Sequence, residues 1–287
     1  MATPRRRLDA ELVRRGLVAS RAEAQEALAA GLVTIDGAPA LKPATQVTST
    51  QGLRLEAPPR AYVSRGGEKL APALAAFGVD PTGRWCLDAG ASTGGFTDCL
   101  LQHGASHVVA YDVGYGQLHE RLRTDPRVTV AERVNVRELT REDITDPPPS
   151  LVVADLSFIS LRSVLPALRA VAAPDAEAVV LVKPQFEAER GQVGKGGVVR
   201  DPRVWQRCLE AVAGAALRVG WRAVDAIASE LVGPAGNVEF LLHLAPAADP
   251  GSRPQDEAGD AQLLPESTRR AIARAVEQGR ARRMAAG

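Results

Sequence analysis

A glycine-rich turn at residues 88–96 constrains the fold of this chain more than any other stretch. It lies between an apolar run, 85–87, and a helix-like run, 97–102. Glycine lets the backbone bend sharply and lets a ligand approach the main chain, and a helix start offers free N–H groups. The turn matches neither the dinucleotide pattern G-x-G-x-x-G nor a phosphate loop, and it contains no basic residue. It predicts a site for a neutral or cationic nucleoside, unless it is an ordinary strand-to-helix connection.

After the turn, short apolar segments alternate with helical ones. We expect strands at 85–87, 108–112, 128–130, 151–155 and 178–183, a helix at about 202–219, and strands near 222–230 and 238–244. This alternation predicts an α/β domain whose sheet is mainly parallel and covered on both faces. Ligands bind such sheets beyond the carboxyl ends of the strands. The residues at those ends are Gly90, Asp112, Asp155 and Lys183, which predicts a single site.

The polar residues near these strand ends fit a nucleoside cofactor, and the acid-led turn suits S-adenosylmethionine. A carboxylate that closes the second strand typically accepts the ribose hydroxyls, which predicts that role for Asp112. Asn135 follows the third strand and is placed to reach the adenine edge. The cofactor-binding residues that we expect are Asp88, Gly90, Ser92, Thr93, Gly94, Gly95, Phe96, Asp112, Asn135 and Asp155. No metal site is expected.

Two lysines and two acids are placed where this site gathers them: Lys69, Asp155, Lys183 and Glu239. Lys183 follows five apolar strand residues and precedes Pro184, which cannot continue a central strand. A buried lysine is costly unless it is paired, and Asp155 and Glu239 are the available partners. Separate structural ion pairs would also explain these residues. The unusual place of Lys183 favours a functional role.

The N-terminal segment is a basic appendage to a body that is close to neutral. Residues 1–63 carry nine Lys/Arg and six Asp/Glu, whereas the whole chain has a net charge of +1. The pattern predicts helices at 8–16 and 20–31, with Ser20 as the cap of the second, a strand at 32–35 and a hairpin turn at 36–37.

This order resembles the small RNA-binding domain named after ribosomal protein S4, and the match runs through residues 7–43. In that family a basic helical face binds structured RNA; a solvated basic helix pair is the alternative. The RNA-contacting residues that we expect are Arg5, Arg6, Arg7, Arg14, Arg15, Arg21 and Lys42, joined by Arg65 and Lys195 of the larger domain.

Composition sets the remaining limits. With 45% hydrophobic and 24% charged residues, the chain has the profile of an ordinary globular protein. No apolar run approaches the roughly 18 residues of a membrane span, and no signal segment is apparent. The cysteines, Cys86, Cys99 and Cys208, show no ligand spacing and are expected as reduced core thiols. We therefore expect a cytoplasmic protein.

From Val63 to Leu244 the chain resembles the FtsJ-type ribose 2′-O-methyltransferases, whose catalytic set is Lys-Asp-Lys-Glu in that order. Over almost its whole length it resembles the TlyA family of bacterial rRNA cytidine 2′-O-methyltransferases, also labelled haemolysins. The matching motifs lie at 64–70, 87–96, 112–118, 154–160, 182–187 and 236–239. The connector departs slightly, with Tyr62 where the family often has Trp.

The resemblance implies a Rossmann-like class I methyltransferase sheet with a small α+β RNA-binding domain. The expected domains are 1–59, which binds RNA, a linker at 60–63, the methyltransferase domain at 64–245, and a linker with a basic C-terminal helix at 246–287. That helix spans 267–278, with Ile272, Ala275 and Val276 facing inward. Whether it docks on the body or serves RNA stays open.

The resemblance also implies a reaction, in which the methyl group of S-adenosylmethionine passes to the ribose 2′-hydroxyl of cytidine in the rRNA of both ribosomal subunits. Lys183 then acts as the base or orients the hydroxyl, Lys69 and Glu239 hold the ribose, and Asp155 holds Lys183 and faces the methyl donor. DNA lacks the acceptor hydroxyl and is not expected as a substrate. The glycine-rich loop at 191–197 is expected to close over RNA.

Two alternatives belong to other functional classes. One is a ribosome-binding or assembly factor that keeps the fold without the reaction. The other is a membrane-lytic protein, which the haemolysin label suggests. The absence of a secretion signal and of a strongly amphipathic lytic helix disfavours the second, so no membrane partner is expected.

Overall fold

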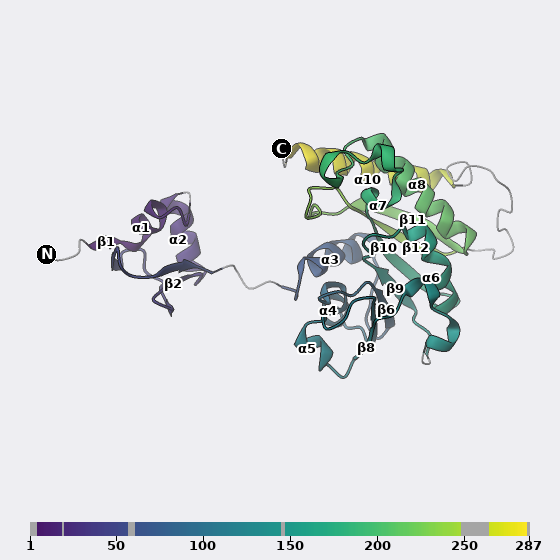
Figure 1. Cartoon of the computed structure of the whole chain (residues 1–287), viewed down its shortest axis with the longest axis horizontal. Coiled ribbons are helices and arrows are strands. Elements are labelled where there is room, and N and C mark those ends of the chain that lie inside the picture. The colour runs from purple at the N-terminus through teal and green to yellow at the C-terminus, as the bar shows by residue number, and fades with distance from the viewer. Residues whose placement is uncertain (1–4, 19, 57–60, 145–146, 248–263, 286–287) are drawn as a thin grey trace. The chain divides into compact units, whose positions relative to one another are not determined.

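The computed structural model describes residues 5–18, 20–56, 61–144, 147–247 and 264–285. The chain divides into two compact units, Met1–Arg60 and Ala61–Gly287 (Figure 1). Most of the linker expected at 246–260 lies outside the described residues. Among the helices of the described residues, none is long and apolar enough to cross a bilayer.

The small unit packs two helices on short strands. Its helices are α1 (Leu8–Arg14) and α2 (Arg21–Ala29), and its strands are β1 (Arg5–Arg7), β2 (Val33–Ile35), β3 (Ala38–Pro39), β4 (Gln46–Thr48) and β5 (Leu53–Leu55). The core contains Leu8, Leu12, Leu28, Val33 and Val47. The Ser20 hydroxyl accepts a hydrogen bond from the Glu23 N–H, which confirms the expected helix cap. The hairpin turn is confirmed by the positive φ angles of Asp36 and Gly37.

The large unit is built on a seven-stranded sheet with the order β11-β12-β10-β9-β6-β7-β8. Its strands are β6 (Trp85–Ala89), β7 (His107–Asp112), β8 (Val128–Glu132), β9 (Leu151–Ala154), β10 (Glu177–Val182), β11 (Trp221–Ala228) and β12 (Phe240–Pro246). Strands β8, β7, β6, β9 and β10 run parallel, and β12 runs antiparallel to both of its neighbours, β10 and β11. The α/β class and the mainly parallel sheet are therefore confirmed.

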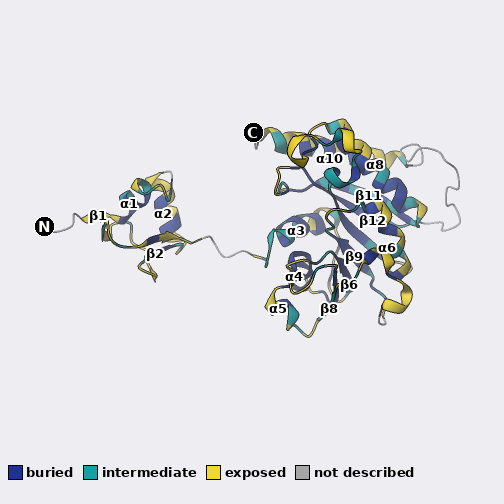
Figure 2. Cartoon of the chain, viewed as in Figure 1, coloured by how far each residue is buried: buried dark blue, intermediate teal, exposed yellow. Residues whose placement is uncertain are grey.

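Helices cover both faces of this sheet, and its strands are largely buried (Figure 2). The helices are α3 (Arg65–Phe77), α4 (Gly95–Gln102), α5 (Glu120–Arg123), α6 (Leu165–Val171), α7 (Pro184–Glu187), α8 (Pro202–Arg218) and α10 (Glu266–Ala285). One core layer joins the strands to α6, α8 and α10, and the other joins them to α3 and α4. Cys86, Cys99 and Cys208 are buried free thiols within these layers, as expected.

The C-terminal helix α10 docks on the body. Ile272, Ala275 and Val276 are buried, as the sequence predicted. The Thr268 hydroxyl donates a hydrogen bond to the Ala223 carbonyl on β11. The helix also passes Gly279, where the sequence indicated its end. A Cβ atom at Gly279 would lie 3.0 Å from Phe240 and Val238, so glycine here serves close packing rather than termination.

Candidate active site

The catalytic candidates meet at one edge of the sheet. Asp155 directly follows β9, Lys183 follows β10, and Glu239 directly precedes β12. Because β10 and β12 are antiparallel with Val182 opposite Phe240, Lys183 and Glu239 occupy neighbouring positions where β10 ends and β12 begins. The strand order, rather than the distance in sequence, therefore brings these residues to one edge.

The Lys183 side chain contacts two residues that follow the neighbouring strand β9. Its Nζ lies 2.7 Å from Oδ1 of Asp155 and donates a 2.8 Å hydrogen bond to Oγ of Ser157. Only 10% of the Lys183 side chain is exposed. The chain turns away after Lys183 because Pro184 begins α7. The amine is thus held in one place by two oxygen atoms, with Asp155 as its ionic partner.

Lys69 and Glu239 form a second, more deeply buried pair. Lys69 Nζ donates to Glu239 Oε2 at 2.6 Å, and the two side chains are 9% and 1% exposed. Lys69 lies on α3, away from its apolar stripe, so this ion pair accounts for a lysine that helix packing alone does not explain. A Cβ atom at Gly233 would lie 2.6 Å from Glu239 Oε1, which shows how closely the preceding turn approaches the carboxylate.

Two cavities open beside the Lys183–Asp155 pair. The larger has a volume of about 530 Å³, and its lining includes Gly90, Ser92, Asp112, Asn135, Asp155 and Phe158. The smaller, of about 160 Å³, shares Gly90, Ser92 and Asp155 with it and adds Lys183. Thr93, Gly95 and Phe96 also line the smaller cavity. Asp155 therefore faces both the nucleoside-sized cavity and the Lys183 amine.

Asp88 and Gly94 line neither cavity, although the sequence suggested that both contact a cofactor. Asp88 is fully buried, and its Oδ2 accepts a 2.7 Å hydrogen bond from the Thr97 hydroxyl. Burial raises the pKa of Asp88 to about 7. A Cβ atom at Gly94 would lie 2.2 Å from Leu122. We therefore assign both residues to shaping the turn.

The space that glycine leaves in the turn is taken up by the protein itself. A Cβ atom at Gly95 would lie 2.2 Å from Ser64 Oγ, and one at Gly90 would lie 2.6 Å from the Asp155 carbonyl oxygen. Gly90 also has a φ of 86°. These glycines let the chain segments around the cavities pack closely, and both residues also line the smaller cavity.

Asp112 and Asn135 line the larger cavity while fixing its walls. The Asp112 carboxylate accepts hydrogen bonds from the Ser92 N–H at 2.8 Å and the Gly114 N–H at 2.6 Å. The Asn135 side chain accepts from the Arg137 N–H and donates to Glu138. Both residues are therefore held in defined orientations at the wall of the cavity.

Phe158 is a cavity residue that the sequence reasoning did not single out. Its side chain is 91% exposed, and its backbone has a φ of 66°, a strained value for a bulky residue. The ring lies 5.2 Å from that of Phe186, measured between centroids. An aromatic residue three positions after the strand-end acid Asp155 was the available sequence signal. Its strained, exposed conformation marks it as a functional candidate.

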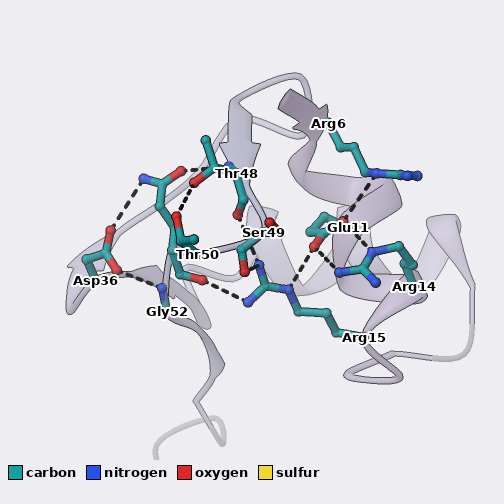
Figure 3. A network of polar contacts seen from close by, with 10 residues as sticks. Arg6, Glu11, Arg14, Arg15, Asp36, Thr48, Ser49, Thr50 and Gly52 are labelled. Carbon is teal, nitrogen blue, oxygen red and sulfur yellow. Dashed lines mark hydrogen bonds and ion pairs between the residues drawn. The ribbon is translucent and has the colours of Figure 1, made fainter. Parts of the chain in front are cut away.

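The small unit holds most of the predicted RNA-binding arginines around two buried acids, and Figure 3 shows the group around one of them, Glu11. Glu11 accepts hydrogen bonds from Arg14 and Arg15, and Arg6 lies 4.0 Å away. The hydrogen bond from Arg14 is the main cause that lowers the pKa of Glu11 to about 2. Arg15 is the least exposed of the three and also bonds the carbonyls of 48, 49 and 51.

Asp9 organises the second part of this arginine cluster. It pairs with Arg7 at 3.0 Å and with Arg21 at 2.7 Å, and the Arg7 hydrogen bond is the main cause that lowers its pKa. Arg5 and Lys42 are exposed without a place in these pairs. The acids offset part of the charge and hold the exposed guanidinium groups in place.

The two cations predicted in the large unit differ in their surroundings. Arg65 donates a 2.7 Å hydrogen bond to the Val232 carbonyl, which ties α3 to the segment before Glu239. Lys195 lies exposed in a 3₁₀ turn, Lys195–Gly197. Lys195 is therefore the freer of the two cations to contact RNA.

The connector residue Tyr62 packs closely on Gly67. A Cβ atom at Gly67 would lie 2.2 Å from the Tyr62 ring.

Comparison with known proteins agrees with this architecture. The family model for the FtsJ-like methyltransferases matches residues 62–245, and the model for the S4 domain matches residues 6–51. The 16S/23S rRNA (cytidine-2′-O)-methyltransferase TlyA of Mycobacterium tuberculosis is 58% identical over 246 residues, which cover 85% of this chain and 91% of the relative.

Two further relatives match nearly the whole chain. YqxC of Bacillus subtilis, named as a candidate rRNA methyltransferase, is 43% identical over 97% of this chain and 95% of its own length. A solved structure from Streptococcus thermophilus, described as a candidate hemolysin, is 38% identical with a TM-score of 0.68, and the match covers 98% of each chain. The chain therefore belongs to the FtsJ-like methyltransferase family, in the TlyA group that joins an S4 domain to the methyltransferase domain, and is an S-adenosylmethionine-dependent methyltransferase.

Proposed function

We propose that the protein methylates the ribose 2′-hydroxyl of a cytidine in ribosomal RNA. The observation that carries the proposal is the Lys183–Asp155 pair, which opens on the smaller cavity and adjoins the larger one. The Lys69–Glu239 pair stands at the neighbouring strand end. The name of the mycobacterial relative supports cytidine and rRNA as the substrate.

The residues of the larger cavity fit S-adenosylmethionine. A volume of about 530 Å³ lies in the range of small-molecule sites. The carboxylate of Asp112 and the amide of Asn135 line this cavity and would hold the ribose and the adenine, and Asp155 lines it next to Lys183. When bound, S-adenosylmethionine supplies an electrophilic methyl group.

Lys183 acts on the acceptor hydroxyl in this proposal. The hydroxyl must lose its proton as its oxygen forms the new bond to carbon, and the Lys183 amine accepts that proton. The Ser157 hydroxyl and the Asp155 carboxylate fix the position of the amine. Lys69 and Glu239 hold the ribose from the neighbouring strand end. Positioning supplies much of the acceleration in such an in-line transfer.

The rest of the chain supplies RNA binding. The arginine cluster around Asp9 and Glu11 presents exposed guanidinium groups for phosphates. Phe158 offers an exposed ring face at the cavity, on which an unstacked base can lie.

We propose that the rRNA of both ribosomal subunits is a substrate and that the reaction takes place in the cytoplasm. We also propose that the domains are the RNA-binding domain at 1–59, a linker at 60–63, the methyltransferase domain at 64–245, and a linker with the C-terminal helix at 246–287.

Methyl transfer to separated ribosomal subunits tests the proposal. Labelled S-adenosylmethionine and wild-type protein are expected to label rRNA at ribose, whereas Lys183→Ala is expected to abolish labelling and retain RNA binding. Protein that binds subunits but transfers no label would support a non-catalytic assembly factor instead. Leakage of liposomes on addition of the protein would revive the lytic alternative.

A further inference from the structure

Asn237 is a buried polar residue that no step of the reaction uses. It stands two positions before Glu239, and only 2% of it is exposed. Its Oδ1 accepts a 2.9 Å hydrogen bond from the Val199 N–H, and its Nδ2 donates a 2.9 Å hydrogen bond to the Gly197 carbonyl. The carboxamide therefore binds a distant part of the chain through both of its polar atoms.

That distant part is a glycine-rich loop, residues 190–199, which follows Lys183 and α7 in the chain. The loop contains two 3₁₀ turns and a bridge between Gly194 and Val198. Gly196 and Gly197 have φ angles of 76° and 74°. Such positions give a backbone little intrinsic stiffness. The loop exposes two cations, Arg190 and Lys195.

Asn237 also belongs to the segment that enters β12. Its carbonyl accepts a 2.8 Å hydrogen bond from the Gly233 N–H. Two residues further on, the Glu239 carbonyl accepts a 2.8 Å hydrogen bond from the Ser229 N–H. The Asn237 side chain thus joins the segment that leaves Lys183 to the segment that enters Glu239, beyond the sheet edge where both catalytic pairs stand.

We propose that Asn237 is a positioning residue that fastens the glycine-rich loop to the catalytic edge, so that Lys195 meets the RNA backbone at a fixed distance from the acceptor ribose. The inference rests on the proposed function. A loop that must be ordered on binding loses part of its contact energy to conformational entropy, and a preorganised loop avoids that loss. Without the carboxamide, the buried Val199 N–H and the partly buried Gly197 carbonyl also lose their partners.

A double-mutant cycle between Asn237 and Lys195 tests this coupling. Lys195→Ala is expected to lower kcat/KM for rRNA by about fivefold in the wild-type background. Asn237→Ala is expected to lower it by about tenfold, mainly through KM, because the loop contact is made on binding. In the Asn237→Ala background, Lys195→Ala is expected to change kcat/KM by less than about twofold, since a loose loop no longer presents the charge.

Three further measurements separate positioning from stability. Asn237→Asp keeps an acceptor for the Val199 N–H but loses the donor to the Gly197 carbonyl. Its kcat/KM for rRNA is therefore expected to be lowered as much as that of Asn237→Ala. Both variants are expected to bind S-adenosylmethionine within about twofold of wild type by calorimetry, which also shows that they are folded. Trp205→Phe is the matched control, because Trp205 Nε1 donates to the Val199 carbonyl without bonding the segment before Glu239. It is expected to lower Tm and to leave kcat/KM for rRNA within about twofold.

The outcomes are distinct. If Asn237→Ala keeps kcat/KM within twofold of an active wild type, or if the effects of Asn237→Ala and Lys195→Ala multiply, the inference is wrong and the proposed function stands. If Trp205→Phe lowers kcat/KM as much as Asn237→Ala does, loss of loop packing alone explains the effect and the inference is also wrong. If the wild-type protein transfers no methyl group, the proposed function fails first.

Discussion

The two units both place carboxylates beside cations, but they differ in what they expose. In the small unit, Asp9 and Glu11 are buried while the side chains of Arg6 and Arg21 are 60% and 57% exposed. In the large unit, the side chains of Lys69, Glu239 and Lys183 are all 10% exposed or less. A buried acid that holds exposed arginines makes a rigid charged surface, which suits phosphate binding. A lysine confined beside a carboxylate and a cavity suits proton transfer.

Removal of the Lys183 amine is expected to have the largest effect. Lys183→Ala should lower the methyl-transfer rate by about 10³-fold or more, because general-base catalysis contributes about 10²–10⁴-fold. Single-turnover assays at saturating rRNA measure this rate, and filter binding checks that RNA affinity stays within about twofold. Lys183→Arg serves as the matched variant, since it keeps the positive charge beside Asp155 but cannot give up its proton. A fast Lys183→Arg enzyme would show that charge, and not proton transfer, is what this position supplies.

The buried pair is expected to carry the next largest effect. Lys69→Ala leaves Glu239 without its ion-pair partner, and loss of one member of a buried pair costs about 3–5 kcal/mol of unfolding free energy. The double variant Lys69→Met/Glu239→Leu should recover most of that stability, because it removes both charges. Urea denaturation measures the stability, and label transfer measures the activity, which should remain absent in the double variant. An active double variant would make this pair purely structural.

The arginine cluster is expected to act on binding alone. Arg21→Gln should weaken rRNA binding and reduce the slope of log affinity against log salt by about 1, since one phosphate contact is lost. The rate at saturating rRNA should stay within about twofold, because no reacting group has changed. Arg54→Gln is the control, an exposed arginine on β5 outside the cluster. Equal salt slopes for Arg21→Gln and Arg54→Gln would show that the arginine cluster is not a specific phosphate-binding surface of the small unit.

The smallest expected effect is the pH dependence of stability, which should have opposite signs in the two units. Glu11 has its pKa lowered to about 2, so the stability that it contributes is present above about pH 4.5 and is lost as the pH falls toward 2. Asp88 has its pKa raised to about 7 by burial, so the large unit should lose stability as the pH rises from about 4 to 7. Hydrogen exchange resolved by unit measures both trends. Asp88→Asn should flatten the second trend, and an unchanged trend in that variant would rule out Asp88 as its source.

Local patterns predicted most of the fold, because strands and helices leave a periodic signal. The strands of the large unit appear within a few residues of the expected ranges, and helix α8 begins at the expected residue. The predicted end of the C-terminal helix at residue 278 was wrong, because α10 continues to Ala285. Gly279 lies within the helix and packs closely against Phe240 and Val238, which are distant in the chain.

The site was only partly predictable. The strand-end positions of Asp112, Asp155 and Lys183 follow from the alternation of elements, and so does their convergence. Which lysine pairs with which acid depends on β12, which runs antiparallel beside β10, and nothing local in the sequence specifies that neighbour.

Three features near the site were not predictable from the sequence, for the same reason. Asp88, which was expected to bind the cofactor, is buried behind the turn, Phe158 is exposed at the cavity, and Asn237 reaches a distant loop. Burial and tertiary contact set each of these features, and a single sequence does not display them.

The most direct test of the account is the chemical identity of the methylated product. Ribosomal subunits that lack the modification are incubated with the protein and labelled S-adenosylmethionine, and the rRNA is digested to nucleosides. We expect the label in 2′-O-methylcytidine with wild-type protein and no label with Lys183→Ala. Label on a base, or label that persists in the Lys183→Ala reaction, would contradict it.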